Sequence, residues 1–293
     1  MKKSPLTLRN LVAGDIENMD RQANKDHWTS WAREHGEGLK ATTRTGTAKT
    51  IEVAALRSAF IQHLPEAEGP FRALEVGCGN GVNCFALAES FPAGEFLGVD
   101  YVPDMVHHAN RSAESRGLTE RCQFLEADAM ALDAALGSTT EFDVAFTVRC
   151  LINLQNDANQ RSALASIASR VRVGGLVFLI ENSQKSYGQQ DELRQELGLE
   201  VREPATFNYF IDETSLFKDL HEIALQHVRT VDISSLHDVV LYVLLPAVNG
   251  GVVDYESPIV DAAARLEAGD AGQLTSRFGG FGQNRLFVLR RQT

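Results

Sequence analysis

The chain has 293 residues, of which 44% are hydrophobic and 23% charged, and its formal net charge is −11 at pH 7. A chain of this length can bury a sizeable core, and its composition is ordinary for a globular protein. The negative charge argues against broad electrostatic binding to nucleic acid or to anionic lipid, so we expect neither as a partner.

The first residues, MKKSPLTLRN, have two lysines but no apolar stretch behind them, which predicts no secretory signal. No window approaches the roughly 18 uninterrupted apolar residues of a membrane span. A cytoplasmic location is therefore the default expectation. The cysteines show no C-x-x-C pair and no histidine at zinc spacing, which predicts apolar packing and no metal site; they are Cys78, Cys84, Cys122 and Cys150.

Residues 1–48 are polar and irregular and contain two close tryptophans, Trp28 and Trp31. Residues 49–63 carry apolar side chains at helical spacing. We expect residues 1–69 to form an N-terminal helical arm, or lid, ahead of the first strand.

Strand and helix patterns then alternate along the chain. This alternation predicts βαβ units, and hence an α/β fold with a doubly wound, mostly parallel sheet covered on both faces. Val173-Gly174-Gly175 is expected to end the last helix of this region and to lead into the fifth strand. The predicted strands span about 72–76, 95–99, 122–126, 142–147 and 176–180, and the helices about 82–90, 104–116 and 159–172.

The pattern beyond residue 182 is less regular. Ser234 and Ser235 are suited to cap a helix that continues to Leu245 and is ended by Pro246. We interpret residues 1–293 as a single domain, with a cofactor-binding core at 70–182 and a C-terminal part at 183–293. Further helices are predicted over 189–197, 212–220 and 257–268, and strands over 224–233 and 285–290.

Three glycines stand at alternate positions between the first predicted strand and its helix, at Gly77, Gly79 and Gly81. Such a loop lets backbone N–H groups approach a nucleotide-bearing ligand. Asp100 ends the next predicted strand, where a carboxylate is placed to accept hydrogen bonds from a ribose diol. Val82 stands where a dinucleotide fingerprint needs a further glycine or alanine, which disfavours an NAD-dependent oxidoreductase.

Together with Glu75, these glycines resemble motif I of class I S-adenosylmethionine-dependent methyltransferases, (E/D)-x-G-x-G-x-G. The resemblance covers about residues 70–182. It implies S-adenosylmethionine as the cofactor and a seven-stranded Rossmann-like sheet whose last strand runs antiparallel. Residues 234–280 would then be an insertion in the C-terminal hairpin, on the substrate side, where they would form a lid or a dimer contact.

The resemblance also implies individual cofactor contacts. Glu75 would support the ammonium of the methionine tail, and Tyr101 would lie against the adenine edge. Asp128 would lie near the adenine amino group, with a capping or loop carboxylate as the alternative. Arg149 would bind an anionic group of the substrate or the cofactor carboxylate, with a strand-end salt bridge as the alternative. The full predicted set is Glu75, Gly77, Cys78, Gly79, Gly81, Asp100, Tyr101, Asp128, Ala129 and Arg149.

A hydroxyl acceptor must lose a proton during methyl transfer, whereas an amine acceptor needs only its neutral form. The residues that could take that proton are His27 in the arm, Glu181 at the end of the fifth strand and His237 in the insertion. The acceptor is expected to contact Trp28, Arg149, Asn182 and Tyr209.

The segment after the fourth strand lacks an Asn/Asp-Pro-Pro-Tyr motif, which disfavours nucleobase methylation. We therefore expect methyl transfer to a small-molecule acceptor, with O-methylation preferred and N-methylation as an alternative. The arm, residues 149–154, Glu181-Asn182 and residues 282–285 also resemble methyltransferases found beside surface-polysaccharide genes, which favours a sugar or sugar-linked acceptor. A non-catalytic module that binds S-adenosylmethionine is a further alternative, and the oligomeric state is left open.

Overall fold

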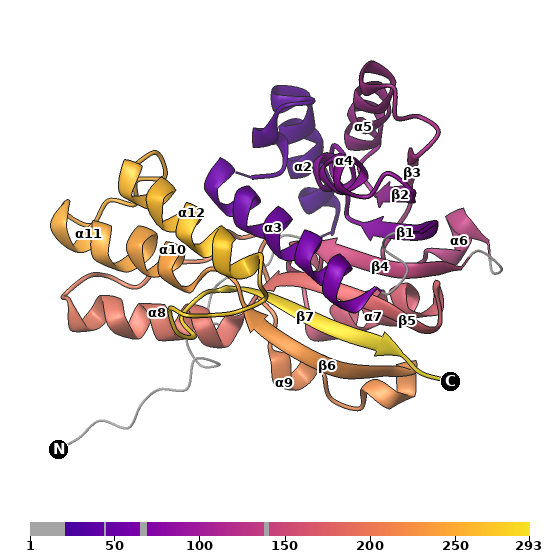
Figure 1. The fold of residues 1–293 in the computed structure, drawn as a ribbon. Helices are drawn as coiled ribbons and strands as arrows, with labels where there is room; N and C mark the ends of the chain where they lie inside the picture. Colours follow the sequence, from indigo (N-terminus) through magenta and orange to yellow (C-terminus); the bar gives the residue numbers. More distant parts are fainter. Residues whose placement is uncertain (1–20, 44, 65–68, 138–140) are drawn as a thin grey trace.

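A computed structural model describes residues 21–43, 45–64, 69–137 and 141–293. Within these residues seven strands form one sheet in the order β3-β2-β1-β4-β5-β7-β6 (Figure 1). Strands β1 to β5 pair in parallel, and β7 runs antiparallel to both β5 and β6. The predicted mostly parallel seven-stranded sheet is confirmed. The strands are β1 (Phe71–Val76), β2 (Gly94–Asp100), β3 (Cys122–Glu126), β4 (Phe142–Val148), β5 (Val171–Asn182), β6 (Leu225–Asp232) and β7 (Asn284–Arg291).

Helices cover both faces of the sheet because successive strand residues point to opposite sides. Phe146 and Phe178 pack in the core cluster of one face, whereas Ala145 and Val177 pack in that of the other. The first face is covered by α3 (Gly46–His63), α4 (Val82–Ser90), α5 (Pro103–Arg116) and α12 (Pro258–Ala271), and the second by α6 (Asp133–Leu136), α7 (Asp157–Ser169) and α9 (Glu213–Leu216).

The arm contains a helix that the sequence pattern did not predict. Helix α2 (Arg21–His35) is followed by a short 3₁₀ turn, η1 (Leu39–Ala41). Trp28 and Ala32 of α2 pack with Met105 at the start of α5. Tertiary packing therefore stabilises this polar segment, which lacks a clear apolar period of its own. Residues 1–20 lie outside the described part of the chain.

Strand β5 begins five residues earlier than predicted. Helix α7 ends at Ser169, and Val173-Gly174-Gly175 belong to the strand rather than to a helix stop. Gly174 adopts φ +81°, and the β4–β5 register shifts between Phe142 and Val144. The glycines therefore accommodate an irregularity in the ladder, a role that glycine commonly has inside a strand.

The segment between β6 and β7 is helical, and Pro246 does not end its helix. The chain passes through α10 (Ser235–Val239), a π-helical turn, η4 (Val240–Leu244), and α11 (Leu245–Val248) before α12. Pro246 lies in the first turn of α11, where no N–H group is required.

The two helices before β6 also differ from their predicted bounds. Helix α8 (Gln184–Glu196) starts earlier than predicted because the Ser183 hydroxyl caps it. The predicted helix at 212–220 is reduced to α9 and the 3₁₀ turn η3 (Leu220–Ile223).

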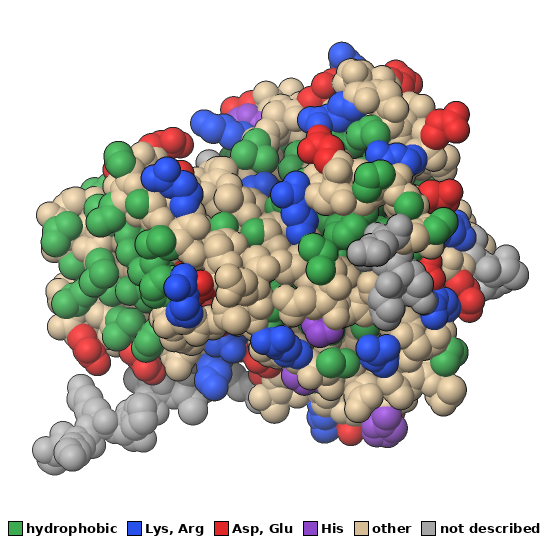
Figure 2. Space-filling view, viewed as in Figure 1, with side chains coloured by type: hydrophobic (Ala, Val, Ile, Leu, Met, Phe, Trp, Pro, Cys, Tyr) green, Lys and Arg blue, Asp and Glu red, His purple; other side chains and the backbone are tan. Residues whose placement is uncertain are grey.

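Apolar side chains gather on the surface around α11 and α12 (Figure 2). Leu244, Val248, Ile259 and Leu266 are each more than half exposed there. The role of residues 234–280 as a lid or dimer contact remains a prediction. None of the helices in the described ranges is long and apolar enough to cross a membrane.

Candidate functional site

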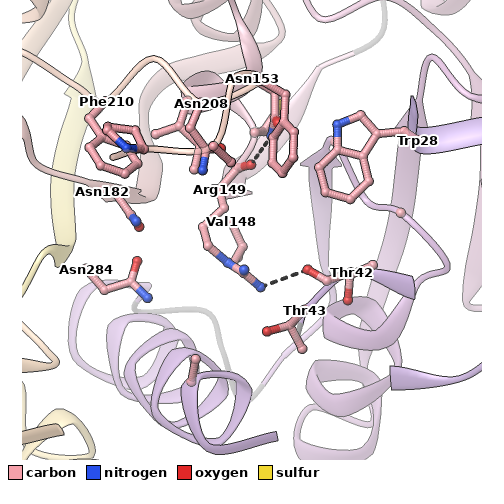
Figure 3. Close-up of a pocket in the computed structure, with 18 of the residues that line it drawn as sticks. Trp28, Thr42, Thr43, Val148, Arg149, Asn153, Asn182, Asn208, Phe210 and Asn284 are labelled. Atoms are coloured by element: carbon pink, nitrogen blue, oxygen red, sulfur yellow. Dashed lines mark hydrogen bonds between the residues drawn. The ribbon is translucent and has the colours of Figure 1, made fainter. Parts of the chain in front are cut away.

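A cavity of about 730 Å³ opens where the carboxyl ends of β1, β2, β4 and β5 meet the arm and the insertion (Figure 3). This is the edge at which open α/β sheets bind ligands, and the volume is in the range of small-molecule sites. The predicted residues that line the cavity are His27, Trp28, Gly77, Gly79, Asp100, Tyr101, Asp128, Ala129, Arg149, Asn182 and His237. Those absent from its lining are Glu75, Cys78, Gly81, Glu181 and Tyr209.

The glycine loop needs glycine at each of its three positions. Gly77, Gly79 and Gly81 have φ values of +74°, +53° and +83°, which other residues rarely adopt. A Cβ at Gly77 would lie 2.5 Å from Cys150 Sγ, and one at Gly79 would lie 2.5 Å from Thr42 Cγ2. The loop is thus held closely between the arm and the segment after β4, and the cavity begins at its bare backbone.

Cys78 and Gly81 contribute to the loop's packing instead of to the cavity wall. A Cβ at Gly81 would lie 2.7 Å from the Phe124 ring, so this glycine allows α4 to approach β3. The Cys78 side chain is buried, and burial raises the pKa of its thiol well above the ordinary value. Neither residue lines the cavity, and their predicted contact with the cofactor stays a prediction.

Asp100 is anchored at the end of β2 with its carboxylate at the cavity. One oxygen accepts a hydrogen bond from Gly79 N and the other from Val102 N, each at 2.9 Å. Burial raises the pKa of this carboxyl above its ordinary value, and the two backbone donors oppose that rise. Each oxygen keeps a second lone pair, so the group can still accept the two hydroxyls of a ribose.

Asp128 follows β3. It lines the cavity, as is expected of a residue near the adenine, and it also has the alternative role of a loop carboxylate. Its Oδ1 accepts a hydrogen bond from Met130 N at 3.0 Å, as a loop carboxylate does, and its Oδ2 pairs with Arg21 of the arm. Tyr101 lines the same end of the cavity, where the Lys25 ammonium lies 5.7 Å from its ring centroid. The arm therefore closes over the part of the cavity in which the adenine is expected.

Arg149 sits in the segment after β4 in a strained backbone conformation, with φ +53°. Its Nε lies 2.8 Å from Glu52 Oε1, and its Nη2 donates to the Thr42 carbonyl at 3.0 Å (Figure 3). Glu52 is fully buried on α3 and also lies 2.8 Å from the ammonium of Lys49. The predicted strand-end salt bridge thus exists, but its partner on α3 was not predicted.

Glu52, Lys49 and Arg149 form a charged cluster with two basic side chains and one acidic side chain. Burial alone would raise the pKa of Glu52, but Arg149 and Lys49 outweigh burial and hold that pKa below its ordinary value. Burial lowers the pKa of Lys49, and Glu52 opposes that fall. Two cations therefore flank a single carboxylate beside the cavity, an arrangement that favours an incoming anionic group such as an amino-acid carboxylate.

Glu75 faces away from the cavity, contrary to its predicted support of the methionine tail. Its two oxygens accept hydrogen bonds from Asn83 Nδ2 at 2.7 Å and from Cys84 Sγ at 3.0 Å, both on α4. The side chain is fully buried, and burial raises the pKa of Glu75 to about 7. We interpret Glu75 as a residue that attaches α4 to β1 and so fixes the glycine loop between them.

Replacing Glu75 with glutamine is expected to remove a pH-dependent destabilisation. Because burial raises its pKa from 4.5 to about 7, ionisation costs more in the folded state than in the unfolded chain. The free energy of unfolding of the native protein should fall relative to that of the variant as pH rises from about 4.5 to about 7, by at most about 3 kcal/mol. Urea denaturation across this window measures the difference. Glu95→Gln, on an exposed position of β2, should show the native slope, and parallel curves for all three proteins would contradict the assignment.

Glu181 is also placed differently from its prediction as a catalytic residue. Its carboxylate lies under the segment after β4 and accepts hydrogen bonds from Thr147 Oγ1 at 2.7 Å and from the backbone N–H groups of Cys150, Leu151 and Ile152 at 3.0–3.2 Å. Burial raises its pKa to about 7, and these donors oppose the rise. With its oxygens occupied in this way, Glu181 positions the segment that carries Arg149.

His237, one of the predicted bases, has a partner at each ring nitrogen. Its Nδ1 lies 2.9 Å from Asp238 Oδ1, and its Nε2 lies 3.0 Å from Thr47 Oγ1. Thr47 Oγ1 is in turn 3.0 Å from Thr45 Oγ1. His237, Asp238 and Thr45 all line the cavity. Thr45 and Thr47 were missed because nothing in the sequence relates them to a histidine about 190 positions away, whereas Asp238 is the next residue after His237 and was available as a signal.

His27 belongs to an aromatic wall of the cavity. Its ring stacks on Phe207 at a centroid distance of 4.5 Å and lies edge-on to Trp28 at 5.2 Å. Tyr209, which was predicted to contact the acceptor, turns its hydroxyl to Asp157 at 2.9 Å, while its neighbours Asn208 and Phe210 line the cavity. In place of Tyr209, its two neighbours therefore form this part of the cavity wall.

Comparisons with known proteins agree with this architecture. Residues 73–175 match the family model of a methyltransferase domain. Demethylmenaquinone methyltransferase of Thermus thermophilus is 35% identical over 39% of this chain and 48% of its own length. Ubiquinone biosynthesis O-methyltransferase of Methylococcus capsulatus is 33% identical over 48% of this chain and 57% of its own length. The chain thus spans about half the length of the curated relatives it matches.

A solved structure extends the similarity of fold to most of the chain. Magnesium protoporphyrin IX methyltransferase from Synechocystis, solved with bound S-adenosylhomocysteine, has a TM-score of 0.57 and 15% identity over 94% of this chain and 100% of that one. The strand order, the glycine loop and the carboxylate after β2 define a Rossmann-like fold with a nucleoside-cofactor site. Residues 73–175 are thus similar to a methyltransferase domain, and the fold and the site agree with the resemblance to class I S-adenosylmethionine-dependent methyltransferases.

Proposed function

We propose that this protein transfers the methyl group of S-adenosylmethionine to a hydroxyl group of a small molecule. The observation that carries the choice of a hydroxyl is the His237–Asp238 pair, which lines the same cavity as the glycine loop and Asp100. A hydroxyl is a poor nucleophile until its proton is removed, and a histidine held by a carboxylate is suited to remove it. N-methylation remains the alternative, because an amine would need no such pair.

The described residues fit the proposed cofactor. The bare backbone at Gly77 and Gly79 leaves room for a ligand at close range, Asp100 can accept the ribose hydroxyls, and the positive cluster around Arg149 suits a carboxylate. When bound, S-adenosylmethionine would supply the electrophilic methyl group on its sulfonium. The residues of this chain then have to orient the acceptor, exclude water and receive one proton.

We further propose that the proton travels along a chain of hydroxyls. With Nδ1–H donating to Asp238, the lone pair of His237 lies on Nε2, which accepts from Thr47 Oγ1. Thr45 Oγ1 lies at the cavity end of this chain. As the methyl–sulfur bond breaks and the new C–O bond forms, the sulfonium would become the neutral thioether of S-adenosylhomocysteine. The acceptor proton would pass to Thr45, the Thr45 proton to Thr47, and the Thr47 proton to Nε2.

Replacing Asp100 with alanine tests the cofactor assignment. The variant should bind S-adenosylmethionine more weakly by about 1–3 kcal/mol, because charge-assisted hydrogen bonds to the ribose are lost. Isothermal titration calorimetry measures this directly, with Asp104→Ala, on the neighbouring helix and outside the cavity lining, as the matched control. An unchanged affinity would contradict the ribose role of Asp100. No binding by the native protein, and no transfer of labelled methyl, would contradict the proposed function itself.

A further inference from the structure

Two asparagines at the acceptor end of the cavity have carbonyl oxygens without a partner. Asn182 ends β5 and Asn284 begins β7, and the two residues are direct neighbours across this antiparallel pair. Each side chain is 7% exposed, and neither Oδ1 atom has a hydrogen-bond donor among the described residues. Figure 3 shows their amide groups pointing toward one another at the cavity. Buried carbonyl oxygens without donors are costly, so a ligand donor is expected between them.

The orientation of the Asn284 amide is fixed by its neighbour on α3. Its Nδ2 donates to Glu52 Oε1 at 3.1 Å. A carboxylate held ionised by Arg149 and Lys49 can only accept, so a reversed amide would place two oxygens against each other. The Asn284 carbonyl is therefore held toward the cavity as an acceptor.

The pair lies near the proposed base, and Asn284 also contacts the Arg149 cluster through Glu52. The backbone carbonyl of Asn284 lies 3.4 Å from Ser234 Oγ, which also donates to Asp238 at 2.7 Å. The two amides thus lie on the side of the cavity that holds the proposed base. Tyr187 and Phe210 also line the cavity and pack against each other, with ring centroids 4.9 Å apart, so this part of the wall is aromatic.

We propose that Asn182 and Asn284 form a clamp that accepts hydrogen bonds from two hydroxyl groups on adjacent carbons, so that the acceptor is a ring bearing a vicinal diol. The clamp determines specificity, because a ring with one hydroxyl leaves one buried carbonyl unsatisfied. This inference rests on the proposed function and names its substrate class. A catechol ring and a sugar ring share this chemistry, and the probes below distinguish them.

The test uses the full chain loaded with S-adenosylhomocysteine and measures binding of defined probes by titration calorimetry. Catechol is compared with phenol and resorcinol, and methyl mannoside is compared with its deoxy counterpart that lacks one of the adjacent hydroxyls. The native protein should bind one diol about tenfold more tightly than its single-hydroxyl counterpart. Tighter binding of catechol identifies an aromatic acceptor, and tighter binding of methyl mannoside identifies a sugar.

Asn284→Ala and Asn182→Ala should each abolish this preference. Asn182→Ala should also leave the affinity for S-adenosylhomocysteine within about twofold of native, whereas Asn284→Ala in addition removes a hydrogen bond to Glu52. Asn249→Ala, on an exposed position after α11, should keep the preference. The clamp is overturned if neither diol binds more tightly than its counterpart, including the case in which no probe binds. It is also overturned if the variants lower the melting temperature but keep the preference, since the two amides would then bond to each other as a structural pair. A failure of the proposed function is distinguishable, because the native protein would then not bind S-adenosylhomocysteine.

Discussion

Replacing His237 with asparagine is expected to lower kcat for methyl transfer to a hydroxyl by about 10²- to 10⁴-fold, the usual contribution of a positioned general base. The asparagine nitrogen can take the place of Nδ1 and keep the hydrogen bond to Asp238, so the surroundings are preserved. The variant lacks any group that can accept the Thr47 proton. The affinity for S-adenosylmethionine should stay unchanged, because the proposed cofactor contacts are made by the glycine loop, Asp100 and the Arg149 cluster and not by His237.

Single-turnover transfer of labelled methyl, with saturating cofactor and the tightest-binding hydroxyl probe, separates this effect from binding. His107→Asn, on an exposed position of α5, is the matched control and should behave as native. An unchanged rate in His237→Asn would remove the base role and favour an amine acceptor, whose neutral form needs no base.

Asp238 is expected to act through His237. In Asp238→Asn the side chain can donate to Nδ1, which favours the tautomer that carries hydrogen on Nε2 and so removes the lone pair from the proton route. The rate should fall without a change in acceptor affinity.

The helices and strands at the core of the fold were predictable because the sequence patterns that determine them lie within a few neighbouring residues. Helix α4 at Val82–Ser90 and strand β3 at Cys122–Glu126 have the predicted bounds, since glycine loops and short apolar runs determine them within a few residues. The arm helix α2 was not predictable in this way, because Trp28 and Ala32 are stabilised by packing on Met105, more than 70 residues away.

The location of the site was predictable, but the directions in which its individual side chains point were not. The carboxyl ends of parallel strands locate the cavity, and Glu181 and Asn182 both lie there. Successive strand residues point to opposite sides, so Asn182 faces the cavity while Glu181 faces the segment after β4. A sequence pattern does not say which of the two is turned inward when both are polar.

The buried cluster did leave a signal in the sequence. Lys49 and Glu52 are three residues apart and lie on the same face of α3 as Leu56 and Phe60, both of which are fully buried. Charges on an apolar stripe indicate a buried pair and a partner from elsewhere. That the partners are Arg149 and Asn284 depends on how β4 and β7 meet α3, which only the tertiary structure provides.

Replacing Arg149 with methionine is expected to lower the free energy of unfolding by about 1–3 kcal/mol, because the fully buried Glu52 carboxylate loses one of its two cationic partners and keeps Lys49. The backbone strain at φ +53° is the same in both proteins and does not contribute to the difference. Urea denaturation without ligand gives the value, and the same variant should bind S-adenosylmethionine more weakly through loss of the positive surplus.

A double-mutant cycle decides whether the loss arises from the buried charge. Glu52→Gln removes the carboxylate, so Arg149→Met combined with Glu52→Gln should cost less than the sum of the two single changes. Arg149→Lys keeps the charge near Glu52 but gives up the planar fork that also reaches Thr42, so its cost should lie between those of the native protein and Arg149→Met. Additive costs would show that Arg149 stabilises the fold by contacts other than Glu52. Such a result would also weaken the argument that Glu52 holds Asn284 toward the acceptor, since the ionised carboxylate is the common element of both.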